Sequence, residues 1–181
     1  TWQSALRDKT SSLIKSEPTL KFGANVIGHI NGVWGVAESA RLIYWAFLDH
    51  IPTNAVNLHE PVEYSYADYG IATTRAPGFM FNIVVLNADS APVMYKPIEP
   101  TLVAPYSWSL WPQRYNTGYW AYELESLPLE QGSSALIYDE IWATSRFTAD
   151  AIWDTLAKDP ATAQIPVLAM PVGVPKRPVS G

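Results

Sequence analysis

The segment 79–87, FMFNIVVLN, is a nearly continuous run of apolar residues. A strand with one face in water alternates apolar and polar side chains, whereas a strand that is covered on both faces is apolar along its whole length. The run therefore predicts a central strand of a sheet that carries helices on both faces. This single feature excludes most all-helical and open antiparallel folds.

The segments on either side of this strand alternate between strand and helix patterns. Residues 22–30, FGANVIGHI, form a short apolar run with glycines near its end, as expected for a buried strand. Residues 36–48 follow with apolar side chains at i, i+3, i+4 and i+7 counted from Ala40, which is a helical stripe. The pattern also predicts strands at 53–58, 115–122, 139–143 and 165–170, and a helix at 145–156 that Thr144 or Ser145 caps.

Strands that alternate with helices in this way are typical of βαβ units. We therefore expect an α/β fold: a Rossmann-like doubly wound, mostly parallel sheet with helices on both faces. The 181 residues are enough for one such domain. We divide them into an N-terminal arm at 1–20, the Rossmann-like domain at 21–175, and the start of a linker or tail at 176–181.

The composition narrows the range of partners. Hydrophobic residues make up 48% of the chain, so it can bury a core, and its net charge of -5 would repel a nucleic-acid backbone. No stretch of about 18 apolar residues predicts a membrane span. The chain has no cysteine, which suits a reducing compartment, and we expect a cytoplasmic location. Its three histidines, His29, His50 and His59, have no metal-ligand spacing, so we expect no metal and no cofactor.

The segment 28–41, GHINGVWGVAESAR, carries the sharpest functional signal. Glycines at 28, 32 and 35 allow a tight turn that presents N–H groups at a helix N-terminus, where the helix dipole favours a phosphate or a carboxylate. The spacing matches neither the dinucleotide fingerprint nor the P-loop. Glycines placed for close packing of helix on strand would explain the segment equally well.

A second segment, GYWAYELESLP at 118–128, follows the strand predicted at 115–122. It places Glu123 and Glu125 and three aromatic rings just past the carboxyl end of that strand, where carboxylates can act as acid and base or bind sugar hydroxyls. The alternative is that the two carboxylates open a helix and interact with its dipole. Tryptophan rings such as Trp120 can line a cleft, but they pack in cores more often.

Four blocks of the sequence, GHINGVWGVAESARLIYWA, GYWAYELESLP, IYDEIWATSRFTADAI and PVLAMPVGV, together resemble the N-terminal domain of family 4 (group 1) glycosyltransferases of the GT-B fold. The resemblance covers about 21–175. It implies the retaining transfer of a sugar from a nucleotide-sugar donor to a hydroxyl acceptor, in a cleft between two Rossmann-like domains. It also implies that this domain mainly binds the acceptor.

The resemblance assigns roles to particular residues. Gly32 and Gly35 match the positions at which the glycine loop approaches the phosphates of the donor. Glu123 matches a residue of the middle motif that faces the sugar, with Tyr119 and Trp120 as walls of the cleft. Many members of the family carry a histidine soon after this strand, and this chain has none there.

The last two blocks complete the comparison with the family. Ser145 and Arg146 match the pair that lies beside the cleft, where the serine caps a helix. The donor-binding domain that would follow is missing from this sequence, so we expect the acceptor-side domain alone to transfer little or no sugar. The alternatives are a non-catalytic module that binds carbohydrate or phosphate, and a nicotinamide oxidoreductase in which Glu60 would bind ribose.

Overall fold

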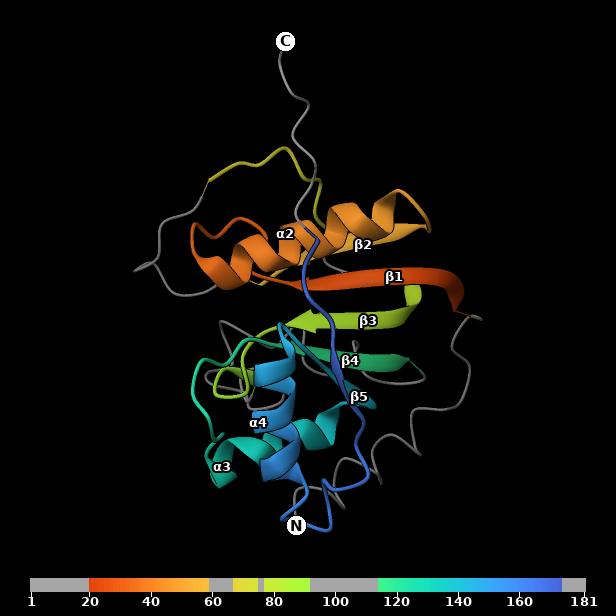
Figure 1. The fold of residues 1–181 in the computed structure, drawn as a ribbon. Coiled ribbons are helices and arrows are strands. Elements are labelled where there is room, and N and C mark those ends of the chain that lie inside the picture. The colour runs from red at the N-terminus through yellow and green to blue at the C-terminus, as the bar shows by residue number, and fades with distance from the viewer. Residues whose placement is uncertain (1–19, 59–66, 75–76, 92–113, 174–181) are drawn as a thin grey trace, which may run out of the picture.

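The computed structural model describes residues 20–58, 67–74, 77–91 and 114–173. Six parallel strands form one sheet in the order β2-β1-β3-β4-β5-β6 (Figure 1). The strands are β1 (Lys21–Gly28), β2 (Thr53–Asn57), β3 (Phe79–Val85), β4 (Tyr115–Trp120), β5 (Glu140–Ala143) and β6 (Val167–Ala169). The helices are α2 (Gly35–Leu48), α3 (Leu129–Gly132) and α4 (Arg146–Leu156), with a 3-10 turn η2 at Ser133–Ile137.

The expected fold class is confirmed. Every strand and helix that the sequence predicts within the described residues is present, with ends that differ by up to two residues. The sequence pattern missed α3 and η2, because neither is long enough to show a helical period. Most of the arm at 1–20, the proline-rich part at 92–112 and the tail at 176–181 lie outside the described residues.

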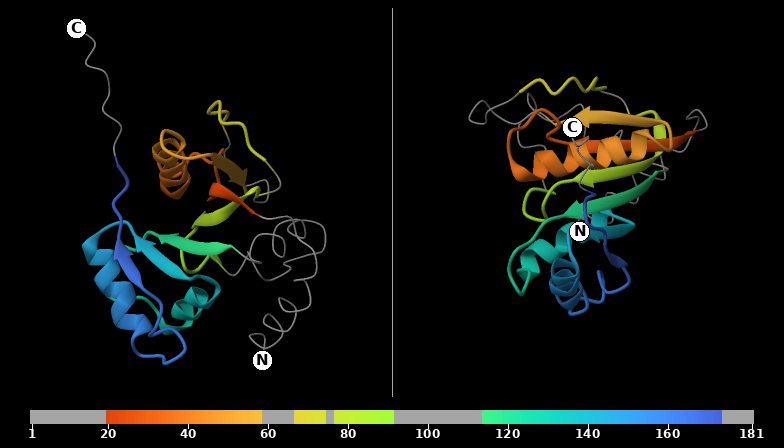
Figure 2. Two further views of the ribbon diagram at one scale, coloured as in Figure 1. Left: turned by 90° about the vertical axis from the view of Figure 1, so that its right-hand side faces the viewer. Right: turned by 45° about the horizontal axis from the view of Figure 1, so that its top comes forward.

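The helices cover the two faces of the sheet (Figure 2). In β1, Val26 and Ile27 point to opposite faces and belong to two separate hydrophobic clusters. The cluster with Val26 contains the apolar stripe of α2, including Ile43, and the cluster with Ile27 contains residues of α4, including Ile152. Because both faces are covered, strand residues in successive positions are buried, and this explains the apolar run in β3.

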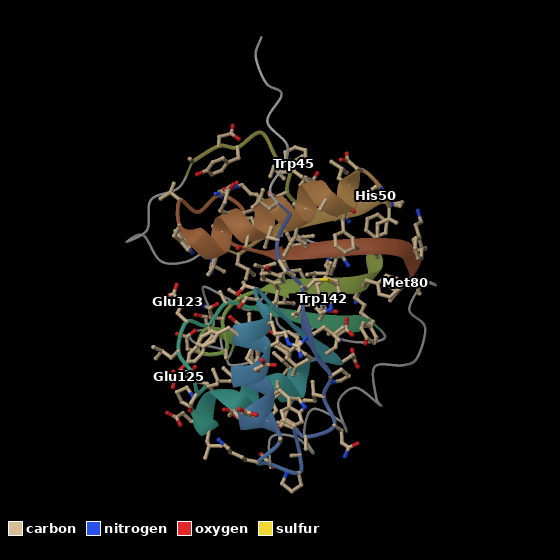
Figure 3. The ribbon with its side chains drawn as sticks, in the orientation of Figure 1. Trp45, His50, Met80, Glu123, Glu125 and Trp142 are labelled. Carbon is tan, nitrogen blue, oxygen red and sulfur yellow. The ribbon has the colours of Figure 1, made fainter. Side chains whose placement is uncertain are left out.

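The strand order reverses direction between β1 and β3. From β1 the chain passes through α2 to β2 at one edge, whereas from β3 it proceeds through β4 and β5 to the other edge. All carboxyl ends of the strands lie along one edge of the sheet, which we call the carboxyl edge; Glu123 and Glu125 lie there, and Met80 and His50 lie at the opposite, amino edge (Figure 3). In open α/β sheets, ligands bind at the carboxyl edge where the order reverses.

A single parallel bridge extends the sheet beyond β2. Thr73 pairs with Ala55, and the N–H of Thr74 donates to the carbonyl oxygen of Ala55 over 2.8 Å. This position outside β2 is the one that a third strand occupies in the Rossmann order 3-2-1-4-5-6. With this bridge, the sheet resembles the Rossmann order more closely than the six strands alone do.

A row of asparagines crosses the amino half of the sheet inside the face that α3 and α4 cover. The Asn25 amide donates to Asn82 Oδ1, and the Asn82 amide donates to Asn116 Oδ1, each over 2.9 Å. These three residues are neighbours in the register of β1, β3 and β4. We call this row the asparagine ladder, and it fixes the register because a slip of one residue would leave its buried amides unpaired.

Candidate binding site at the carboxyl edge

The glycine turn that joins β1 to α2 lies at the carboxyl edge beside the reversal of strand order. Its three glycines serve different purposes. A Cβ atom at Gly28 would lie 3.1 Å from the carbonyl oxygen of Val85 and 3.2 Å from the Ala40 Cβ, so this glycine permits close packing of α2 on the sheet. A Cβ at Gly32 would lie 2.7 Å from the Trp34 ring, so the space beside Gly32 is filled by that indole.

Gly35 differs from the other two glycines because a Cβ there would meet nothing within 4 Å. Gly35 is the first residue of α2, and the N-cap residue Trp34 makes no side-chain hydrogen bond to the first turn. The space beside Gly35 is therefore open, and no side-chain hydrogen bond caps the N-terminus of this 14-residue helix. Of the two glycines expected to approach a phosphate, Gly35 has the room for it.

Arg41 holds the glycine turn in place. Its Nη1 donates to the carbonyl oxygens of Ile30 (2.8 Å) and Gly32 (2.6 Å), and its Nε and Nη2 donate to Glu38 Oε2. The guanidinium carbon lies 3.7 Å from the centre of the Tyr69 ring. Arg41 is buried although it lies on a surface helix, and its charge is paired with the carboxylate of Glu38. We infer that Arg41 acts by rigidifying the turn.

Two further contacts fix the turn against β2. The ring nitrogen Nδ1 of His29 donates to the carbonyl oxygen of Leu58 over 3.2 Å, and the N–H of Asn31 donates to Asn57 Oδ1 over 3.1 Å. His29 is buried, and this hydrogen bond makes it part of the framework of the turn. His50 is exposed at the other end of α2, and His59 lies outside the described residues.

The end of β4 places Tyr119 and Trp120 in the core. They are 2% and 1% exposed, one in each hydrophobic cluster, and Trp120 also lines the small cavity between the loops that follow β3 and β4. Burial raises the pKa of Tyr119 to about 12; the backbone of Val172 near its hydroxyl opposes the rise but makes no hydrogen bond of regular geometry with it. The core-packing alternative for Trp120 is thus the one that the structure fits.

Glu123 and Glu125 lie on the exposed loop that follows β4 (Figure 3). They do not open a helix, because α3 begins only at Leu129. Their carboxylates are therefore presented to solvent at the carboxyl edge. Glu123 is exposed and available for contact with a ligand, two strands along the sheet from the glycine turn.

Ser145 caps α4, as expected. Its Oγ accepts from the N–H of Thr148 over 3.1 Å, and the Thr148 hydroxyl donates to the carbonyl oxygen of Tyr122 over 2.9 Å. The cap thus ties the start of α4 to the loop that carries Glu123. Arg146, the first residue of α4, is exposed beside it.

A small cavity of about 70 Å³ lies between the loops that follow β3 and β4. Asn87, Asp89, Tyr122 and Gln131 are among its lining residues. Asn87 Oδ1 accepts from the N–H of Ala121 over 3.1 Å and so joins the two loops. A water molecule takes about 30 Å³ in the liquid, so the cavity has room for about two water-sized groups, such as sugar hydroxyls.

The sequence analysis missed two residues that build this edge, Arg41 and Asn87. Arg41 has the helical spacing of a solvent-facing residue, and only its place six residues after Gly35 gives a signal. Asn87 gives a clearer sequence signal. Its side-chain amide follows directly after a buried strand, where such amides frequently form hydrogen bonds with backbone groups of a neighbouring loop.

Comparisons with family models, with curated proteins and with solved structures find no significant match to this chain. Within the described residues, no group of histidine and carboxylate side chains could hold a metal ion. No helix in the described part of the chain is long and apolar enough to cross a membrane.

Proposed function

We propose that the chain is the acceptor-side domain of a retaining glycosyltransferase that moves a sugar from a nucleotide-sugar to a hydroxyl acceptor. The observation that carries the proposal is the position of Gly35, which combines open space and an uncapped helix N-terminus at the reversal of strand order. Topology and local chemistry favour an anionic ligand at the same point. The resemblance of the four sequence blocks supplies the reaction type.

In this proposal the carboxyl edge has two parts. The phosphates of the donor lie over the N-terminus of α2, and the acceptor lies over the ends of β3 and β4, where Glu123 and the small cavity offer oxygen atoms to hydroxyl groups. Transfer requires a donor-binding domain that holds the nucleotide against the acceptor, because much of the rate comes from that positioning. We place the reaction in the cytoplasm, which agrees with a chain that has no cysteine.

The test is a titration with uridine diphosphate followed by backbone amide NMR. We expect the amide signals of Gly35 and Val36 to shift and to saturate, because these N–H groups face the proposed phosphate position. Gly35→Val should remove the shift, since its side chain fills the open space, while the melting temperature stays within a few degrees of the wild type.

Gly173→Val is the matched control, because a Cβ at Gly173 also meets nothing within 4 Å and Gly173 belongs to no helix. It should bind the diphosphate like the wild type. If the diphosphate shifts no amide at the carboxyl edge, or if Gly35→Val binds it unchanged, the proposal fails. Turnover of a nucleotide-sugar by the 181-residue chain alone would contradict the proposed division of labour.

A further inference from the structure

The largest hollow described in this structure lies on the opposite half of the sheet from the proposed transferase site. It is a groove of about 350 Å³ over the amino half of β1, β3, β4 and β5, on the face that α2 covers in part. This volume is within the range of small-molecule sites. Trp142, one of its lining residues, lies over the middle of the sheet below α2 (Figure 3).

Five of the ten residues that line this groove are aromatic. Phe81 contacts Phe22 and Tyr115 edge to face, with ring centres 6.0 and 6.3 Å apart. On another side, Phe47 of α2 stacks on Trp142 with ring centres 6.3 Å apart and planes inclined by 22°. Phe22 and Tyr115 are 60% and 42% exposed, so apolar rings are left open to solvent here. Such a patch of exposed rings marks a binding site more often than a solvated surface.

A single carboxylate, that of Glu140, lies among these rings. Its Oε1 accepts from Trp142 Nε1 over 2.8 Å and from the Thr117 hydroxyl over 3.4 Å. The Tyr115 hydroxyl faces the same carboxylate, and burial together with that contact raises the pKa of Tyr115. These donors orient the carboxylate without neutralising it, because no basic side chain in the described part of the chain forms an ion pair with Glu140.

Aromatic rings and an unneutralised carboxylate in one groove together favour a cationic ligand. The faces of tryptophan, tyrosine and phenylalanine rings attract cations, and cages of such rings recognise quaternary ammonium groups. A neutral apolar molecule would bury the carboxylate without compensation, and an anion would be repelled. We propose that this groove is a binding site for a small organic cation with an alkylammonium head group, distinct from the site at the carboxyl edge.

The test compares two probes of the same shape, choline and its uncharged carbon analogue 3,3-dimethylbutan-1-ol. The wild-type chain is titrated with each, and binding is followed on the indole Nε1–H signal of Trp142, which Trp142→Phe identifies by its absence. We expect choline to bind at least about tenfold more tightly than the neutral analogue, because only choline pairs with Glu140 and the ring faces. Butylammonium, a primary ammonium ion, serves as a third probe. If butylammonium binds more weakly than choline, the groove prefers ligands with a quaternary ammonium head group.

Glu140→Gln tests the charge while keeping the size of the side chain and an oxygen for the Trp142 indole. We expect it to weaken choline about tenfold and to leave the neutral analogue unchanged. Glu130→Gln is the matched control, since Glu130 is an exposed carboxylate of α3 on the other face of the sheet. That variant should bind choline as the wild type does.

Each other outcome overturns the proposal. Equal binding of the two isosteric probes would mean that the groove is merely apolar, and equal losses in Glu140→Gln and Glu130→Gln would mean a general effect of net charge. Absence of binding by choline and butylammonium would mean that no such site exists. Should Glu140→Gln fail to fold, Phe47→Leu replaces it: loss of a ring face should weaken choline and spare the neutral analogue.

Discussion

The two ends of the sheet differ in what holds them together and in what they leave open. At the amino end, the asparagine ladder fills one face with paired amides, and the aromatic groove opens on the other face. At the carboxyl end, separate side-chain contacts hold the loops: Arg41 donates two hydrogen bonds to the glycine turn, and Asn87 accepts one from Ala121. The only hollow described there is small and polar.

Because of this difference, two arguments that usually locate the same binding site, one from sheet topology and one from the size of the hollow, point to different ends of the sheet. The reversal of strand order selects the carboxyl edge, where we propose that a ligand binds. The size of the hollow selects the amino half, where Glu140 and aromatic residues line one groove. In this molecule, topology and the size of the hollow therefore select opposite ends of the sheet.

The largest expected effect is at the asparagine ladder, because its amides are buried and depend on one another. Asn82→Ala removes both central bonds and leaves Asn116 Oδ1 without its partner from β3. The Asn25 amide keeps its bonds to the carbonyl oxygens of Phe79 and Phe81. The lost bond to Asn116 costs about 1–3 kcal/mol and the deleted buried side chain leaves a cavity, so we expect a loss of about 2–4 kcal/mol in urea unfolding. Asn54→Ala, in the half-buried part of β2, should cost clearly less. Equal costs would mean that the ladder does not act as a unit.

The next effect depends on pH and concerns Tyr119, near the carboxyl end of β4. Burial raises the pKa of this tyrosine to about 12 from 10.0, so the folded state retains the phenol proton more tightly than the unfolded state. Its contribution to stability is complete below pH 10 and is lost as the pH rises to 12, by about 1–3 kcal/mol.

The Tyr119→Phe variant has no phenol proton to lose. Its free energy of unfolding should therefore decline less than that of the wild type between pH 10 and 12, and the two proteins should differ little at pH 7. Urea unfolding of both proteins at pH 7, 10 and 11.5 measures the difference. A constant difference between them at all three pH values would show that the Tyr119 hydroxyl does not titrate with unfolding.

The fold could be predicted from the sequence because its signals are local and repeated. One local signal marks each element: an apolar run marks β3, a glycine turn precedes α2, and a serine caps α4. The alternation of strands and helices then allows few topologies. Short elements without a period, α3 and η2, gave no such signal.

The sites were less predictable because they depend on contacts between distant segments. Gly32 and Gly35 look alike in sequence, yet the Trp34 ring fills the space beside one of them only. An apolar strand pattern made Tyr119, Trp120 and Trp142 look equivalent, but Trp142 is half-buried and lines the groove. Nothing in the spacing of Phe22, Phe81 and Glu140 indicates that they line one groove over four neighbouring strands.

The smallest effect is expected at the carboxyl edge, where Asn87 offers a direct counterpart to Asn82 on the same segment of chain. Asn87→Ala leaves the N–H of Ala121 unpaired, but this contact is only half-buried and water can replace it. We expect a cost of about 1 kcal/mol in urea unfolding and faster amide exchange in the loop 121–127. A cost as large as that of Asn82→Ala would mean that the carboxyl edge is as rigidly built as the ladder. Its open loops would then be a preformed site, and no ordering of this loop would be needed before an acceptor binds.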